Sequence, residues 1–197
     1  MRNVNLRKLT LLLLCSLFPV SCKSLNTGAD AAFITAARQA DETAIRAALE
    51  KGANPNTPPH PGETNLGILI QQYKRSSDGQ KKAIERSVST LLQKGADPEA
   101  LHHGFTPLQI ATGQGSEAIV SDLITYGANP SAETAAGYAP IWQTVYDNNY
   151  RIGQQLLQAG ADPNTLNHSG QTPLQYLRER GFKRTKLMLQ LRHFGGN

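Results

Sequence analysis

Apolar and polar positions follow a helical period along most of the chain. In the segment SEAIVSDLITYG, four apolar residues share one helical face, at positions i, i+1, i+4 and i+5: Ile119, Val120, Leu123 and Ile124. Polar residues fill the opposite face. The pattern predicts an all-α chain of short amphipathic helices, and a helix pair of this kind cannot bury its own apolar stripe.

Two sequence motifs recur in step with this pattern. The closing motif Gly-Ala-Asp/Asn-Pro begins at Gly52, Gly95, Gly127 and Gly160, with spacings of 43, 32 and 33 residues. An opening motif, clearest as TPLQ, is headed by Thr64, Thr106, Ala139 and Thr172, with spacings of 42, 33 and 33 residues. Because the two motifs keep the same phase, the chain is an array of similar units that must stack to bury their apolar faces.

The local chemistry of the motifs fits the ends of helices. Thr106 and Thr172 are good N-cap residues, and each is followed by a proline at the first helical position. The glycine of each closing motif lies just past a helix, where a left-handed backbone is favourable for glycine alone. We expect five units, at about 32–56, 60–98, 102–130, 135–163 and 168–193; the first is partial, and the last lacks a closing Gly-Ala-Asp.

The period of 33 residues, with T-P-L opening one helix and L-L-x-x-G-A-D closing another, resembles the ankyrin repeat. The resemblance covers nearly all of the chain after the N-terminal segment. It implies an all-α solenoid of about five helix-turn-helix units with short hairpin-like loops, formed by residues 32–197. It also implies a non-enzymatic module that grips a partner protein on a concave wall, made by the loop tips and the first helix of each unit.

The second unit contains ten extra residues within QQYKRSSDGQKKAIERS. Since the flanking motifs keep their phase, the insertion belongs between the two helices of that unit. It either lengthens both helices or forms a loop around Ser76–Gln80. Its cations are Lys74, Arg75, Lys81 and Lys82, which predict a contact site for an acidic partner or lipid headgroups, or simply a solvated helix extension.

The N-terminal segment 1–21 has the pattern of an export signal. Basic residues precede an apolar stretch of about 12 residues, shorter than the roughly 20 that a membrane-spanning helix needs. The run FPVSC resembles the lipobox of bacterial lipoproteins, which implies that Cys22 carries a lipid anchor, with 22–31 as a linker. The implied location is the bacterial cell envelope, with Lys23 favouring the outer membrane. If the segment is an ordinary signal peptide, the protein is periplasmic or secreted.

Charge and cysteine content narrow the function classes. The full chain has a net charge of +5, but three of its cations lie in segment 1–21, so the remainder carries only +2. Nucleic-acid binding therefore lacks the strongly basic surface that it needs. Cys15 lies in the signal segment, and Cys22 alone can form neither an internal disulfide nor a cysteine zinc site.

Motifs of catalysis are absent from the sequence, so we expect no enzyme, no cofactor and no resident metal. Three histidines, His60, His102 and His168, precede the head residue of their unit by four positions, and His103 adjoins one of them. An alternative hypothesis is therefore a metal- or pH-responsive envelope protein using His60, His102 and His103. Otherwise these are polar loop residues that face water.

The register of the repeats predicts which residues form the binding wall. Aromatic and arginine side chains supply most hot spots of protein interfaces, so we give weight to Phe105, Tyr138 and Tyr146. Trp142 is expected to pack in the core against the next unit. The complete set of predicted wall residues is His102, His103, Phe105, Gln114, Tyr138, Tyr146, Asp147, Gln171, Glu179 and Arg180.

Overall fold

The computed structural model describes residues 27–134, 137–183 and 185–197. The expected signal segment 1–21 and Cys22 lie outside the described residues. Helix α2 (Thr27–Gln39) begins within the segment 22–31 that the sequence indicated as a linker. Among the residues described, no helix combines the length and the apolar character needed to cross a membrane.

The described chain consists of helices joined by turns, with a single isolated β-bridge between His102 and Phe105. The helices after α2 are α3 (Glu42–Glu50), α4 (Asn65–Gln72), the 3-10 helix η1 (Tyr73–Arg75), α5 (Asp78–Gln93), α6 (Pro107–Gln114), α7 (Glu117–Thr125), α8 (Pro140–Tyr146), α9 (Tyr150–Gln158), α10 (Pro173–Glu179) and α11 (Lys186–His193). They form five pairs in chain order. The predicted all-α fold is confirmed.

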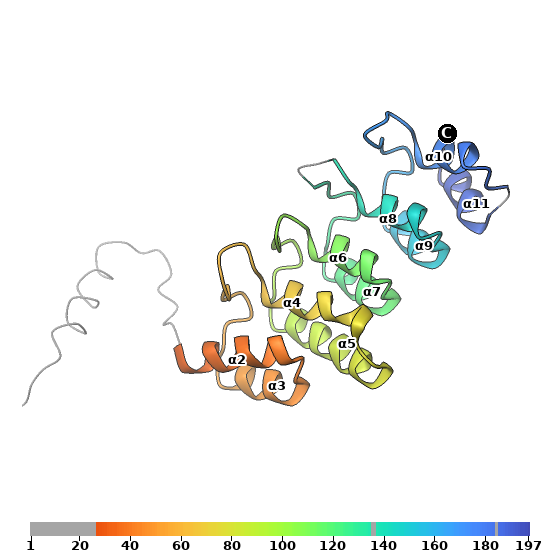
Figure 1. The fold of residues 1–197 in the computed structure, drawn as a ribbon. Helices are drawn as coiled ribbons and strands as arrows, with labels where there is room; N and C mark the ends of the chain where they lie inside the picture. Colours follow the sequence, from red (N-terminus) through yellow and green to blue (C-terminus); the bar gives the residue numbers. More distant parts are fainter. Residues whose placement is uncertain (1–26, 135–136, 184) are drawn as a thin grey trace, which may run out of the picture.

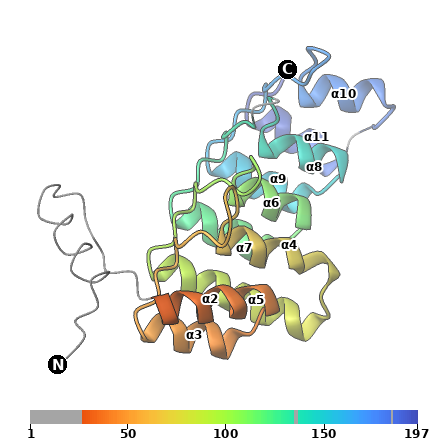
Figure 2. The same cartoon turned by 60° about the vertical axis from the view of Figure 1, so that its left-hand side comes forward.

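The pairs pile up in sequence to make two layers, as Figures 1 and 2 show from two directions. The first helices α2, α4, α6, α8 and α10 contact one another in order, and the second helices α3, α5, α7, α9 and α11 do the same. One continuous apolar core lies between the layers. Isolated helices of seven to nine residues are too short to persist in water, so this packing stabilises them.

The repeated motifs end the helices in the expected way. The Thr106 hydroxyl accepts a hydrogen bond from the Gln109 N–H at 3.2 Å, and the Gln109 side chain accepts one from the Thr106 N–H at 2.9 Å. Thr172 and Gln175 form the same capping box. At the other end, the closing glycines all have positive φ, for example 86° at Gly95. These observations confirm the predicted caps.

A ladder of hydrogen bonds joins the closing motifs of adjacent units. In each rung, the residue that follows the motif's proline accepts a hydrogen bond from a backbone N–H of the next closing motif. The acceptor side chains and the backbone N–H groups that donate to them are Asn56 and Asp97 at 2.9 Å, Glu99 and Asn129 at 2.8 Å, Ser131 and Asp162 at 3.2 Å, and Asn164 and Asn197 at 2.9 Å. One side chain per unit thus sets the register of the next unit.

The last rung shows that the fifth unit has a closing motif after all. Gly195 has φ of 91°, and the Gly196 N–H donates to the Leu191 carbonyl at 2.7 Å. Ala161 makes the equivalent bond to Leu156 at 2.9 Å in the preceding unit. The segment Gly195-Gly196-Asn197 therefore occupies the place of Gly-Ala-Asp, which pattern matching alone did not find.

The ten inserted residues lengthen the helices of the second unit. Helix α5 has 16 residues, whereas α7 and α9 have nine each, and η1 extends α4 by one further turn. Ser77 caps α5 with a capping box to Gln80. Of the two predicted arrangements, the structure has the longer helices rather than a loop around Ser76–Gln80.

Candidate functional site

Two depressions lie on the side of the array that carries the first helices and the loops before them. Nine of the ten predicted wall residues line one or the other. The tyrosine pocket has a volume of about 600 Å³ and is lined by Tyr138, Tyr146, Asn167, His168, Ser169, Gln171, Tyr176, Glu179 and Arg180. The cationic groove, about 1000 Å³, includes Arg38, Glu63, Lys74, Arg75, His102, His103, Phe105, Gln114 and Gln143 in its lining.

The tyrosine pocket lies over a rigid aromatic cluster. Trp142 in α8 is fully buried, and its Nε1–H donates to the Thr165 carbonyl at 3.2 Å. The Tyr146 and Tyr176 rings contact it at centroid distances of 5.7 and 5.8 Å, and contact each other edge to face at 5.5 Å. The predicted core position of Trp142 is confirmed. Because Trp142 is fixed by its hydrogen bond and burial, it holds the two tyrosines in place.

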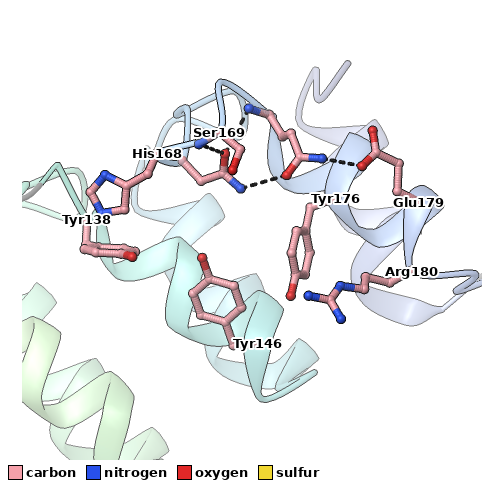
Figure 3. A pocket seen from close by; sticks show the side chains of 9 residues that line it. Tyr138, Tyr146, His168, Ser169, Tyr176, Glu179 and Arg180 are labelled. Carbon is pink, nitrogen blue, oxygen red and sulfur yellow. Dashed lines mark hydrogen bonds between the residues drawn. The ribbon is translucent and has the colours of Figure 1, made fainter.

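A chain of polar side chains forms the rim of this pocket (Figure 3). The Asn167 amide donates to the Gln171 Oε1 at 3.0 Å, and the Gln171 amide in turn donates to the Glu179 carboxylate. On the same side, the Arg180 guanidinium lies 5.1 Å from the centre of the Tyr176 ring. The pocket therefore combines exposed aromatic faces with ordered donors and acceptors, a composition typical of interface hot spots.

The Tyr146 phenol stays protonated at neutral pH. Burial raises the pKa of Tyr146 above its usual value of 10.0, and the neighbouring phenols of Tyr138 and Tyr176 act in the same direction. The Tyr138 ring is held by an edge-to-face contact with His168 at 4.5 Å. Tyr138 and Tyr146 are nevertheless 36% and 44% exposed, so their faces remain open to a partner.

The cationic groove is built by η1 of the second unit and the first helix of the third. The Lys74 N–H donates to the Gln114 Oε1 at 3.1 Å, which joins the two units at the groove. Glu63 accepts from the Arg38 guanidinium at 2.7 Å, and the His103 ring lies 3.8 Å from its other oxygen. Phe105 is 50% exposed at the edge of the groove. The groove thus presents cations, amides and one exposed ring.

His102 is not the exposed residue that the sequence predicted. Its side chain is only 1% exposed, and its Nδ1 accepts a hydrogen bond from the Thr64 N–H at 3.0 Å. The ring fits because Gly67 has no Cβ, which would otherwise lie 2.3 Å from the His102 Cγ. His102 therefore joins the second and third units, and the expectation of a loop histidine facing water is wrong for this residue. His60 and His168 are exposed.

The electrostatic surroundings of His102 favour the neutral ring. Burial lowers its pKa, and the adjacent His103 ring, 4.5 Å away between centroids, lowers it further. Glu63 acts in the opposite direction. In the part of the chain that the structure describes, no three His, Cys, Asp or Glu residues lie close enough together to hold a metal ion.

Asp147 is the one predicted wall residue outside both depressions. It lies exposed at the end of α8, where its carboxylate accepts from the Gln143 amide at 2.8 Å. Conversely, the structure adds Tyr176, which the sequence analysis did not select. A signal for it exists, because the fourth residue after each head residue lines one of the depressions: Ile68, Ile110, Gln143 and Tyr176.

The helix pairs stack in order, helices start at capped Thr-Pro sequences, and the pairs close with left-handed glycines. The first helices and their loops carry the two depressions. Together these features define an all-α ankyrin-repeat solenoid. The ankyrin repeat family model matches residues 103–135, which cover the third unit and the loop after it. Ankyrin repeats are modules of protein–protein interaction. The comparison thus agrees with the fold that the helix pairs display.

Similar proteins include the putative ankyrin repeat protein YahD of Escherichia coli strain K12, at 26% identity, with 80% of this chain and 93% of that protein covered. The chain is also 30% identical to the neurogenic locus notch homolog protein 1 of Danio rerio, over 71% of this chain. Mitochondrial disaggregase of Bos taurus is 28% identical over 57% of this chain. This chain spans only 5% of the notch homolog and 23% of the disaggregase.

Proposed function

We propose that this chain is a non-enzymatic binding module that grips a partner protein on the wall containing the tyrosine pocket and the cationic groove. The observation that carries the proposal is the tyrosine pocket itself. Tyr138 and Tyr146 keep more than a third of their surface exposed, although the buried Trp142 fixes the aromatic cluster below them. Pre-ordered aromatic surface of this kind loses little entropy on docking.

The role of such a module is to hold its partner, either as a scaffold of an envelope complex or as an inhibitor, including an immunity protein. Both roles need a rigid surface rather than reacting groups. The repeat frame supplies one because its units are joined by the hydrogen-bond ladder and by a continuous core.

Membrane attachment through a lipid on Cys22 is the second part of the proposal, and the sequence alone supports it. The basic start, the short apolar stretch and the FPVSC run are the pattern of an exported lipoprotein. The location would then be the cell envelope, with the outer membrane favoured. A Cys22→Ala variant is expected to lose both incorporation of radiolabelled palmitate and recovery in the membrane fraction; unchanged palmitate labelling contradicts the anchor.

Cross-linked capture from detergent-solubilised membranes tests the binding wall. We expect a specific partner to be recovered with the native chain and lost with the double variant Tyr138→Ala, Tyr146→Ala. Tyr126→Ala is the matched control, since Tyr126 is 40% exposed at the end of the second helix α7 and lines neither depression. Equal recovery by the double variant and the native chain refutes binding on this wall.

A further inference from the structure

The carboxylates of the wall are already satisfied by neighbouring donors. Glu63 pairs with Arg38 at 2.7 Å, and Asp147 accepts from the Gln143 amide at 2.8 Å. Glu179 accepts from the Gln171 amide, whose orientation is fixed by Asn167. These acidic groups therefore have less capacity to attract a cationic ligand than free carboxylates would have.

Three cations of the same wall lack such partners. Within the described residues, Lys74, Arg75 and Arg180 form no ion pair with a carboxylate, although all three are exposed. Arg180 rests instead on the Tyr176 ring. Elsewhere on the surface, Arg86 pairs with Glu42 at 2.7 Å. The wall thus offers positive charge that the described residues do not neutralise.

These cations lie at the two ends of the wall, and aromatic surface lies between them. Lys74 and Arg75 belong to the second unit, Arg180 to the fifth, and the exposed rings of Phe105, Tyr138 and Tyr146 fall in the third and fourth units or the loop between them. Three steps between stacked helices of about 8–10 Å each separate the two ends by roughly 24–30 Å. An extended peptide covers this distance with about eight or nine residues.

We propose that the wall takes an extended acidic segment of the partner protein, with carboxylates near both ends and aromatic or aliphatic side chains between them. This inference rests on the proposed function and adds the chemistry of the partner. Its central side chains meet Phe105 and the tyrosine pocket, while its ends pair with Lys74 and Arg75 and with Arg180. A flat lipid surface fits poorly, because Lys74 and Arg75 line a depression rather than a protruding face.

Fluorescence anisotropy of a labelled peptide tests this inference directly. The probe is a fluorescein peptide of about nine residues, with two glutamates at each end and leucine and tyrosine between them. The protein is the full chain in a neutral detergent. We expect saturable binding that weakens as salt increases, and no binding of the same peptide with lysines in place of the glutamates. Emission of Trp142, the sole tryptophan, gives a second signal from beneath the tyrosine pocket.

Charge-reversal variants assign the contact. Lys74→Glu and Arg75→Glu are each expected to lower the affinity for the acidic peptide by about fivefold or more, because each replaces one ion pair with a repulsion. Lys82→Glu is the matched control, because Lys82 is exposed in α5 and lines neither depression. Tyr146→Ala should also lower the affinity for this peptide, since it removes part of the aromatic contact.

Several outcomes overturn the inference. They are no binding of the acidic peptide, equal binding of the lysine peptide, or an equal effect of Lys82→Glu. Binding of the chain to phosphatidylglycerol vesicles that depends on Lys74 and Arg75 would assign these cations to lipid instead. If membrane capture still depends on Tyr138 and Tyr146 while the acidic peptide fails to bind, the wall binds a partner of different chemistry and only this inference is refuted.

Discussion

His102 makes the junction between the second and third units sensitive to acid. The ring is buried, and its Nδ1 must be unprotonated to accept the hydrogen bond from the Thr64 N–H. Protonation removes that acceptor and places a charge beside the His103 ring, with Glu63 as the only described carboxylate that acts on it. We therefore predict that the free energy of unfolding decreases as the pH falls below about 6.5.

The sign and size of this change in the free energy of unfolding follow from the protonation of His102 in the folded and the unfolded chain. Burial lowers the folded pKa of His102 below its usual 6.5, so the unfolded chain takes up a proton that the folded chain does not. The stabilisation is complete above pH 6.5 and is lost as the pH falls from there toward the folded pKa. The slope is at most about 1.4 kcal/mol per pH unit, or about 2 kcal/mol between pH 6.5 and pH 5. Leaving the partly buried Thr64 N–H without its acceptor costs about 1–3 kcal/mol, which is comparable with this loss of stability.

Urea denaturation followed by Trp142 emission between about pH 5 and pH 7.5 measures this slope. The His102→Gln variant is expected to be less stable at pH 7.5 and to lose the part of the pH dependence that His102 contributes. His103→Gln is the control and should keep it, since His103 is exposed and makes no equivalent buried hydrogen bond. A His102→Gln variant with the same pH slope as the native chain refutes the reasoning.

Three further substitutions and one control test the packing of the repeats by urea denaturation. Gly67→Ala should cost about 1–3 kcal/mol, because its Cβ meets the His102 ring. At Gly113 a Cβ would lie 4.0 Å from the Gln143 Cγ, an ordinary contact, so Gly113→Ala should be neutral or slightly stabilising. Gly160→Ala should cost about 1–2 kcal/mol, since φ is 96° there; an unchanged stability contradicts the left-handed cap. Asn56→Ala should cost about 0.5–1.5 kcal/mol, because it removes the exposed hydrogen bond from the Asp97 N–H; a neutral effect shows that water replaces that rung.

The fold could be predicted from the sequence because its determinants are local and repeated. Thr106 and Thr172 mark helix starts, the closing glycines mark helix ends, and both recur in phase. The closing segment Gly195-Gly196-Asn197 escaped this reasoning because glycine replaces alanine in it. Its backbone geometry, rather than its residue types, shows that it belongs to the same series.

The candidate site was predictable only in part. Register alone placed Tyr138 and Tyr146 on the wall, and the structure brings them to one pocket. The burial of His102 was not predictable, since it depends on the missing side chain of Gly67 in the preceding unit. The hydrogen bond that the Glu179 carboxylate accepts from the Gln171 amide likewise depends on Asn167, which orients that amide. No spacing in the sequence reveals this arrangement.

The ladder of closing motifs also determines how the array comes apart. Each described rung joins one unit only to the next, and the helices of a unit likewise pack on those of its neighbours, so opening one central junction leaves two blocks that keep their own internal bonds. Fraying should therefore begin at an end and advance unit by unit. Among the five described units, amide exchange should be slowest in the third, which has two described units before it and two after it.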